Sequence, residues 1–234
     1  FFLVLQPDIG GAAILIGGSM MVIICGGANL KDLFLIIIKL GFILVVILSM
    51  LFNVSSESLE KVDHVKDRIV AFLHPWDYPA GAAFQLIQGY YGMGNGGIDG
   101  AGFGKSIQKF LYLPYPHTDF IFAIMAEEMG FIGSFIFLMI YLLFLLRALV
   151  VSLRCDNVFG RLVGIGIVSL LSVQTFINIG GVTGLIPITG VPLPFISYGG
   201  SSLLVYMCSM GIVLSISRTP KDRVINRRKA THRL

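Results

Sequence analysis

The chain has 234 residues, of which 56% are hydrophobic and 13% are charged, and its mean hydropathy is +0.86. Because roughly a quarter of the residues in soluble domains are charged, this composition excludes a soluble globular protein and indicates an integral membrane protein. The three cysteines lie far apart, which argues against a disulfide framework or a cysteine metal site.

Apolar stretches long enough to cross a membrane recur along the chain. A hydrocarbon core of roughly 30 Å requires about 17 or more apolar residues in a helix. Five stretches approach or exceed this length, the first kinked at Pro7 and the last short: 1–26, 33–53, 120–147, 162–179 and 202–216. We therefore expect an all-α, polytopic transmembrane helix bundle, with two spans in 1–53, a loop at 54–118, three spans in 119–217 and a tail at 218–234. The first apolar run has no initiating Met, so we expect the chain to be part of a longer protein.

Basic residues predict the orientation of these spans. The tail at 218–234 has seven Lys or Arg and one acidic residue, and Arg147, Arg154 and Arg161 follow the third span. Basic segments beside spans face the cytoplasm, so we expect both segments inside and the 54–118 loop outside. We interpret the tail as a contact with membrane lipids and expect no nucleic-acid partner.

The 54–118 loop is longer than an ordinary connection, which is typical of a functional segment. Residues 67–77 alternate charged with aromatic residues and contain a Pro, so we expect an amphipathic piece at the membrane surface. Residues 92–106 are rich in Gly, which permits positive φ and a close backbone approach to a ligand. They end in Gly-Lys-Ser but lack the spacing of a phosphate-binding P-loop, so we expect no nucleotide site.

Asp119 stands at the start of the third apolar stretch and is the first candidate for a catalytic group. A carboxylate inside a bilayer costs roughly 2.5 to 3.5 kcal/mol and is tolerated mainly where it faces a partner, a cavity or a reaction. A second interpretation makes Asp119 a helix cap or a first-turn acid stabilised by the helix dipole. The residue types alone leave both interpretations open.

Three further carboxylates fall within the apolar stretches. Glu127 and Glu128 follow Asp119 by eight and nine residues, which puts them about 12 to 13 Å deeper at 1.5 Å per residue. At that depth they are too far to act on the same group, so we expect them to hold neighbouring spans together or to line the floor of a cavity. Asp8, in the first span, has the same two interpretations.

The connection at 180–194 contains Pro and Gly residues that interrupt a continuous helix. Irregular backbone at membrane depth must line protein or a water-filled cavity, so we expect this segment to form a wall of the site. Ser197 and Tyr198, just beyond it, are candidates for hydrogen bonds to substrate, although small residues at the start of a span also serve helix packing.

Several motifs, in order along the chain, resemble those of the SEDS family, the FtsW, RodA and SpoVE group of shape, elongation, division and sporulation proteins. They are Gln-Pro-Asp-Ile-Gly at 6–10, Phe-Gln-Leu-Ile-Gln at 84–88, Gly-Asn-Gly-Gly at 94–97, Gly-Lys-Ser-Ile-Gln-Lys at 104–109, His-Thr-Asp-Phe-Ile-Phe at 117–122 followed by Glu127 and Glu128, and Pro-Leu-Pro-Phe-Ile-Ser-Tyr-Gly-Gly-Ser-Ser at 192–202. Relatives usually have Glu where this chain has Tyr115, and often Ser where it has Gly89.

This resemblance implies the C-terminal half of a ten-span peptidoglycan glycosyltransferase. Such an enzyme polymerises lipid II at the outer face of the bacterial cytoplasmic membrane, together with a class B penicillin-binding protein. The essential acidic residue of the family falls on Asp119.

The implied reaction needs a base for the acceptor sugar's 4-hydroxyl and positive charge for the departing pyrophosphate. Asp119 is the expected base. Arg68, Lys105 and Lys109 are the expected pyrophosphate contacts, each with a solvated loop charge as the alternative, and a divalent cation, Mg or Mn, is a candidate to share this task. His117 either orients Asp119 or the substrate, or is structural.

Two other functions remain open from the residues. A lipid II flippase or other transporter would need ionisable residues near the midplane, where Glu127 and Glu128 are expected, and would use broken helices. A non-enzymatic scaffold would only recruit a penicillin-binding protein. The subfamily also stays open, because residues 108–114 resemble division and sporulation members whereas residues 189–194 also suit the elongation member.

Overall fold

The computed structural model describes residues 8–29, 68–79, 81, 83–111, 113–114 and 116–231, together with isolated positions between 31 and 41. Most of the predicted second span, residues 54–67 of the loop, the kink at Pro7 and Tyr115 lie outside the described residues. The described part is helical and contains no strand. The predicted all-α class is therefore confirmed.

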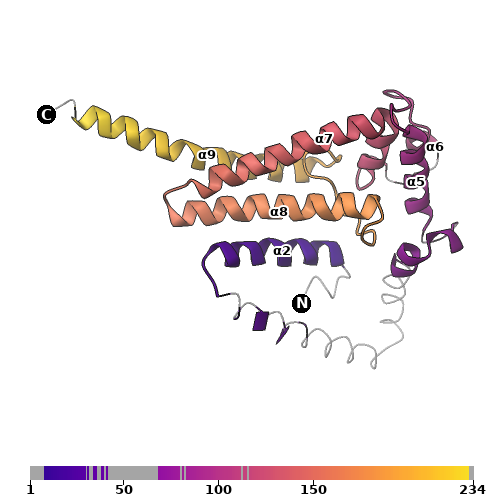
Figure 1. Ribbon diagram of the computed structural model, residues 1–234, viewed down its shortest axis with the longest axis horizontal. Helices are drawn as coiled ribbons and strands as arrows, with labels where there is room; N and C mark the ends of the chain where they lie inside the picture. Colours follow the sequence, from indigo (N-terminus) through magenta and orange to yellow (C-terminus); the bar gives the residue numbers. More distant parts are fainter. Residues whose placement is uncertain are drawn as a thin grey trace.

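The helices form an elongated bundle with a smaller group of helices at one end (Figure 1). The bundle consists of α2 (Ile9–Cys25), α7 (Ile121–Leu153), α8 (Val158–Val182) and α9 (Gly200–Thr231). The end group consists of a helical stretch at 68–73, η1 (Pro75–Asp77), α5 (Phe84–Gly96) and α6 (Gln108–Leu111). The C-terminus lies beyond the opposite end (Figure 1).

Helix α8 is central to the bundle, because it contacts α2, α7 and α9. Along the α2–α8 contact, Gly18 of α2 faces Leu170 and Gly17 faces Val173. Small residues let two helices approach closely where lipid tails remove the hydrophobic driving force. On the other side of α8, Val168 packs with Ala148 of α7 and Val213 of α9 in one buried cluster.

Three helical segments are long and apolar enough to cross a membrane: Ile121–Leu153, Val158–Val182 and Gly200–Arg218. Together with the all-helical bundle they indicate a multi-pass membrane protein. The last segment is longer than the short span expected at 202–216, and its helix continues to Thr231 through the basic tail. Helix α8 likewise extends beyond the predicted 162–179 at both ends.

Asp8 caps the start of α2. Helix α2 begins at Ile9, and the Gly11 N–H donates to Asp8 Oδ1 at 2.9 Å. An N-cap carboxylate satisfies one of the unpaired N–H groups of the first turn. The structural interpretation of Asp8 is therefore the one that its contacts support.

Replacing Asp8 by Ala is expected to lower the stability of the protein by about 1 kcal/mol, because the first turn of α2 loses its cap. Asn caps as well as Asp, so Asp8→Asn should stay close to wild type. Thermal unfolding of the purified protein in detergent measures both variants. Equal losses in the two variants would contradict the capping role.

The predicted third span is not continuous, because α7 breaks at Gly130. This residue has φ 68° and ψ −172°, which are not helical values. Residues 131–153 after the break span about 34 Å at 1.5 Å per residue, enough for the hydrocarbon core on their own. Glu127 and Glu128 precede the break, in the first part of α7 on the side of the end group.

The segment 97–102 supplies the hydrogen bonds that the broken helix lacks. The Ala101 and Gly102 N–H groups donate to the carbonyls of Glu127 and Glu128 at 2.9 and 3.0 Å. The Phe131 N–H in turn donates to the Gly97 carbonyl at 2.9 Å. Buried backbone groups need such partners. The sequence suggested that the Gly-rich segment approaches a ligand. In the structure its residues 97–102 instead approach the backbone of α7.

Gly130→Ala is expected to destabilise the protein by about 2 to 5 kcal/mol, through the left-handed backbone and the overpacking of the new methyl group. A Cβ atom at this position would collide with backbone atoms of Ile98 and Gly100. Gly94→Ala is the matched control, because a Cβ there meets nothing within 4 Å. Thermal unfolding in detergent compares the two, and a Gly130→Ala protein as stable as Gly94→Ala would contradict the packing described.

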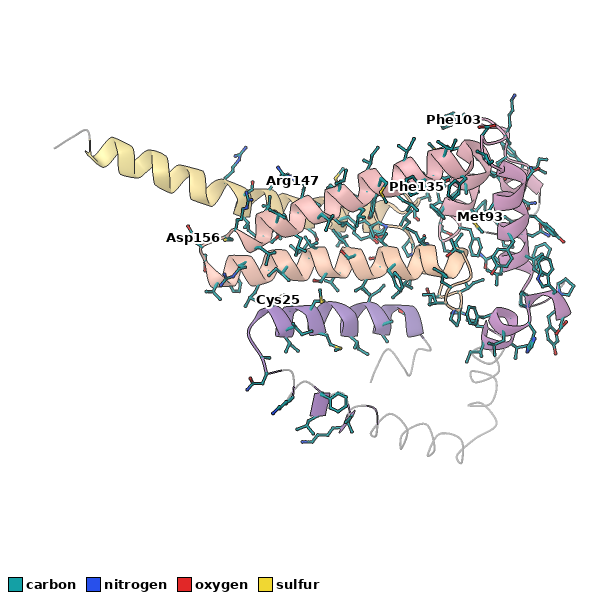
Figure 2. The ribbon with its side chains drawn as sticks, viewed as in Figure 1. Cys25, Met93, Phe103, Phe135, Arg147 and Asp156 are labelled. Atoms are coloured by element: carbon teal, nitrogen blue, oxygen red, sulfur yellow. The ribbon has the colours of Figure 1, made fainter. Side chains whose placement is uncertain are left out.

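The two ends of the bundle differ in character. Figure 2 shows Met93 and Phe103 at the end that carries α5 and α6, and Arg147 and Asp156 at the opposite end. Arg154 ends α7 at this opposite end, and the basic tail of α9 extends beyond it (Figure 1). The basic segments used to predict orientation therefore lie away from the end group.

Candidate functional site

Helix α5 lies alongside the first part of α7. It makes hydrogen bonds to two carboxylates, one just before α7 and one within its first part. At its start, Gln85 Nε2 donates to Asp119 Oδ2 at 3.3 Å. At its end, Asn95 Nδ2 donates to Glu127 Oε1 at 3.1 Å. The carboxylates of Asp119 and Glu127 thus face the same helix but different parts of it, which divides the candidate residues into two groups.

The Asp119 carboxylate is half-buried and hydrogen-bonded by neutral groups. The Thr118 hydroxyl donates to Oδ1 at 2.8 Å, and the Gln85 amide donates to Oδ2. A carboxylate has about four lone-pair positions, so these two bonds leave capacity for a further donor. The side chain is therefore oriented by its neighbours and still able to accept a proton.

The backbone around Asp119 is held at three successive carbonyls. The Tyr198 N–H donates to the His117 carbonyl at 2.8 Å, and the Ser197 hydroxyl donates to the Thr118 carbonyl. Asn178 Nδ2 donates to the carbonyl of Asp119 at 2.7 Å. Because these donors come from α8 and from the segment before α9, two distant parts of the chain determine where the Asp119 backbone lies.

The irregular segment before α9 is held by polar side chains from inside the bundle. Asn178 Nδ2 donates to the Val191 carbonyl at 2.7 Å, and Gln174 Nε2 donates to the Pro192 carbonyl at 2.9 Å. The Tyr141 hydroxyl of α7 donates to the Pro194 carbonyl at 3.3 Å. These bonds replace the helical hydrogen bonds that Pro and irregular backbone cannot make.

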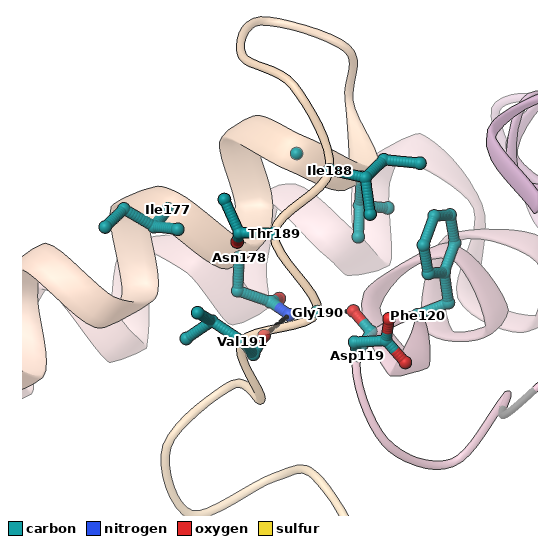
Figure 3. A pocket seen from close by; sticks show the side chains of 10 residues that line it. Asp119, Phe120, Ile177, Asn178, Ile188, Thr189, Gly190 and Val191 are labelled. Carbon is teal, nitrogen blue, oxygen red and sulfur yellow. Dashed lines mark hydrogen bonds between the residues drawn. The ribbon is translucent and has the colours of Figure 1, made fainter. Parts of the chain in front are cut away.

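A small pocket with room for about one water-sized group lies beside Asp119 (Figure 3). Its wall includes Ile188–Val191, which agrees with the expectation that the Pro- and Gly-rich connection forms a wall of the site. The polar side chains on the wall are Asp119, Asn178 and Thr189. The pocket is far smaller than the roughly 300 to 1,000 Å³ of typical ligand sites, so it suits a single small group of a larger ligand, such as one hydroxyl.

Glu127 is fully buried, with 0% exposure, and it holds the segment that carries the candidate lysines. The Ser106 hydroxyl donates to Oε2, and the Ile107 N–H donates to Oε1 at 3.0 Å. The Ser106 oxygen also accepts the Lys109 N–H at 3.1 Å. Together with Asn95 these donors surround the carboxylate, so its contacts are structural and join 105–109 to α7.

The three candidate pyrophosphate contacts lie on the end group. Lys105 is exposed, and Lys109 is half-buried with its ammonium 5.5 Å from the centre of the Phe110 ring. Arg68 is exposed at the start of the 68–73 stretch, which packs through Ala71 against the start of α5. Both lysines flank the segment held by Glu127, and the stretch that begins at Arg68 packs against the α5 end that carries Gln85.

The remaining candidates divide into backbone and side-chain roles. His117 and Tyr198 are joined through their backbones, whereas both side chains are exposed and available to a ligand. The Ser197 hydroxyl accepts the Leu193 N–H at 2.7 Å and donates to Thr118, so its contacts are structural. Glu128 is half-buried, and its carbonyl accepts from the Gly-rich segment.

The described residues contain no group of three or more His, Cys, Asp or Glu that would bind a metal ion. Mg²⁺ sites in enzymes of phosphate chemistry often use one or two carboxylates and take the other ligands from substrate phosphates. Asp119 is the only carboxylate on the pocket wall formed by described residues. These residues do not fit a metal site made by the protein alone, so no step below is routed through a metal.

The chain as a whole was compared with known proteins. Residues 1–222 match the family FTSW_RODA_SPOVE, described as cell cycle proteins. The chain belongs to this family, the SEDS proteins. The resemblance seen in the motifs is therefore confirmed over most of the chain.

Individual SEDS relatives agree with this result. Stage V sporulation protein E of Bacillus subtilis is 42% identical over 214 residues, which are 91% of this chain and 55% of that protein. The probable peptidoglycan glycosyltransferase FtsW of the same organism is 41% identical over 213 residues, or 91% and 52%. A solved structure of a peptidoglycan synthase complex matches with a TM-score of 0.66 and 30% identity, over 92% of this chain and 57% of that one. The chain spans about half the length of these relatives.

The packing of α5 accounts for one departure of this chain from the SEDS motifs, the Gly at position 89. A Cβ atom at Gly89 would lie 2.8 Å from Cε1 of Phe120, which is too close for ordinary contact. A Ser at this position would therefore require the Phe120 ring to move. Gly89 permits the close contact between α5 and the start of α7 that brings Gln85 to Asp119.

Several residues of this SEDS site were not predicted from the sequence. They are the side chains that hold Asp119, its backbone or the neighbouring segment: Gln85, Gln174, Asn178 and Tyr141. Gln174 and Asn178 are four residues apart in an apolar helix, so they share one face. This spacing of uncharged polar residues was the available signal, and attention to charged residues alone missed it.

Proposed function

We propose that the full-length protein is a peptidoglycan glycosyltransferase that polymerises lipid II at the outer face of the bacterial cytoplasmic membrane. The observation that carries this proposal is the setting of Asp119, a half-buried carboxylate at the edge of a pocket, with its backbone held by Asn178, Ser197 and Tyr198. A base needs such a fixed position within reach of the proton that it removes. The name of the FtsW relative supports the same reaction.

In the proposed step, Asp119 accepts the proton of the acceptor sugar's 4-hydroxyl. The hydroxyl oxygen then forms the glycosidic bond to the anomeric carbon of the donor, and the bond from that carbon to the pyrophosphate breaks. The electron pair of the broken bond leaves with undecaprenyl pyrophosphate. Lys105, Lys109 and Arg68 stabilise its charge, because cations placed where negative charge develops lower the barrier.

The proposed surroundings follow from charge and family. The basic residues Arg147 and Arg154 and the tail lie away from the end group, so we place them in the cytoplasm and the Asp119 end outside. A class B penicillin-binding protein is the proposed partner, supported by the similarity to a structure of a peptidoglycan synthase complex. Identities of 42% and 41% to sporulation and FtsW relatives support a role in sporulation or division rather than elongation.

A lipid II transporter and a non-enzymatic scaffold are the alternatives. The transporter interpretation needed an ionisable residue deep in the bundle. Glu127 precedes the break in α7, and its carboxylate is surrounded by Ser106, Asn95 and the Ile107 N–H. These contacts leave Glu127 a structural role and support the polymerase over the transporter.

The test uses the full-length protein, purified with its penicillin-binding partner, whose transpeptidase is blocked. Lipid II is added, and glycan chains are separated by length on a gel. The proposal expects chains of many disaccharides. Movement of lipid II across vesicles without any glycan would contradict it and favour the transporter, and neither activity would favour the scaffold.

A further inference from the structure

Asn178 is a buried amide, 3% exposed, on α8 next to Asp119. Its Nδ2 group donates to the carbonyl oxygens of Asp119 and Val191, each at 2.7 Å. Carbonyl oxygens only accept hydrogen bonds, so the nitrogen of the amide must face them, and this fixes which way the amide points. Both donor hydrogens are used by these bonds, and the Oδ1 atom remains as a free acceptor.

Asn178 Oδ1 is buried, and no donor among the described residues bonds to it. Buried acceptors in folded proteins are nearly all paired, since an unpaired one loses its hydrogen bonds to water without replacement. The residue lines the pocket together with Asp119 and Thr189 (Figure 3). A donor group of a ligand that enters the pocket would pair with Oδ1.

The wall of the pocket selects the chemistry of that ligand. Its polar residues are Asp119, Asn178 and Thr189, and none of the described residues that line it is Lys, Arg or His. A phosphate group only accepts hydrogen bonds and carries negative charge, so it does not suit this wall. A sugar hydroxyl donates, so it does.

We infer that Asn178 Oδ1 accepts a hydrogen bond from the 3-hydroxyl of the acceptor sugar, the neighbour of the 4-hydroxyl that Asp119 deprotonates. This inference rests on the proposed function. The pocket then takes this one hydroxyl while the ring of the acceptor sugar lies at its mouth, and the pyrophosphate of the donor binds outside it, toward the basic residues of the end group. Asn178 would thus hold the Asp119 backbone through its Nδ2 group and the acceptor sugar through its Oδ1 atom.

The first experiment needs no variant. The wild-type complex joins a lipid II donor to three acceptors: the normal acceptor, one lacking the 3-hydroxyl and one lacking the 6-hydroxyl of the terminal sugar. Loss of one hydrogen bond to Asn178 is expected to lower kcat/KM by about tenfold for the 3-deoxy acceptor. The 6-deoxy acceptor should react within about twofold of the normal one, because the inference gives its hydroxyl no partner in this pocket.

The second experiment repeats the comparison in two variants. Asn178→Ser keeps one donor for a carbonyl, and its shorter side chain withdraws the acceptor oxygen from the ligand, so the 3-deoxy penalty should shrink to less than about twofold. Gln174→Leu is the matched control, because Gln174 holds the same segment at Pro192 but does not line the pocket. It should slow all three acceptors and keep the full 3-deoxy penalty.

Each outcome has a defined meaning. An unchanged penalty in Asn178→Ser would overturn the inference and leave Asn178 a structural residue. Equal wild-type rates with the normal and 3-deoxy acceptors would overturn it even if neither variant folds. A wild-type complex that forms no glycosidic bond with any acceptor would instead overturn the proposed function, and this inference with it.

Discussion

Asp119→Asn in the full-length protein is expected to lower the initial rate of lipid II polymerisation at least about 100-fold, the usual contribution of a general base. The amide oxygen still accepts the hydrogen bond from Thr118, and the Asp119 carbonyl still accepts from Asn178. The Gln85 amide, which donates to Asp119 Oδ2, can turn so that its oxygen accepts from the new NH₂ group. The fold is therefore expected to persist, whereas the amide cannot accept the proton. Glycan formation with the transpeptidase of the partner blocked measures the rate.

Asp99→Asn is the matched control for this variant, because it removes a carboxylate that is exposed on the end group. It should retain polymerisation within about twofold of wild type, as expected for a surface change away from special features. Thermal unfolding and co-purification with the partner establish that both variants are folded. An Asp119→Asn protein as active as Asp99→Asn would show that another group is the base.

Glu127→Ala is expected to destabilise the protein by about 3 kcal/mol or more, because it leaves the Ser106 hydroxyl, the Asn95 amide and the Ile107 N–H without their acceptor. The Gln side chain in Glu127→Gln has nearly the same shape as Glu. Its oxygen can accept from Asn95 and Ile107, and its nitrogen can donate to the Ser106 hydroxyl, which reverses its own direction. The Gln variant should therefore stay within about 1 kcal/mol of wild type.

Thermal unfolding in detergent compares the two Glu127 variants. The large difference between Ala and Gln is the expected sign of a carboxylate used as a hydrogen-bond acceptor. If Gln is as damaging as Ala to stability, the charge itself is required and the contacts described do not explain the residue. If Gln is stable but inactive, Glu127 takes part in the chemistry.

The spans α7, α8 and α9 could be predicted because apolar length is a property of the local sequence. Their ends were less predictable. α8 begins at Val158 with the Asn157 side chain as its cap, and α9 continues through the basic tail to Thr231. Hydropathy marks the part of a helix that crosses the membrane, and it carries no information about a helix that continues into water.

The break at Gly130 could not be predicted from α7 alone. A single Gly in an apolar helix is ordinarily tolerated in membranes, where neighbouring groups satisfy the freed backbone. Here the partner is the segment 97–102, some thirty residues earlier in the sequence. The Gly-rich segment and the Gly of the helix require each other, and only the fold brings them together.

The candidate site was predicted where its residues belong to recognisable motifs and missed where neutral polar side chains of α8 hold it from inside the bundle. Asp119 and Ser197 belong to two motifs far apart in the sequence, and the structure joins these motifs through the Ser197 hydroxyl, which donates to the carbonyl of Thr118 beside Asp119. Asn178 carries no charge and belongs to none of the family motifs recognised in the sequence. Its importance comes from the carbonyls of Asp119 and Val191, which are distant in the sequence.

The most direct test of the account measures lipid II polymerisation and lipid II movement across vesicles side by side, in Asp119→Asn and Glu127→Gln. The account predicts that Asp119→Asn loses polymerisation while Glu127→Gln retains it, because only Asp119 faces the pocket. The reverse result, with polymerisation intact in Asp119→Asn and lipid II movement lost in Glu127→Gln, would contradict the glycosyltransferase site described and favour a transporter.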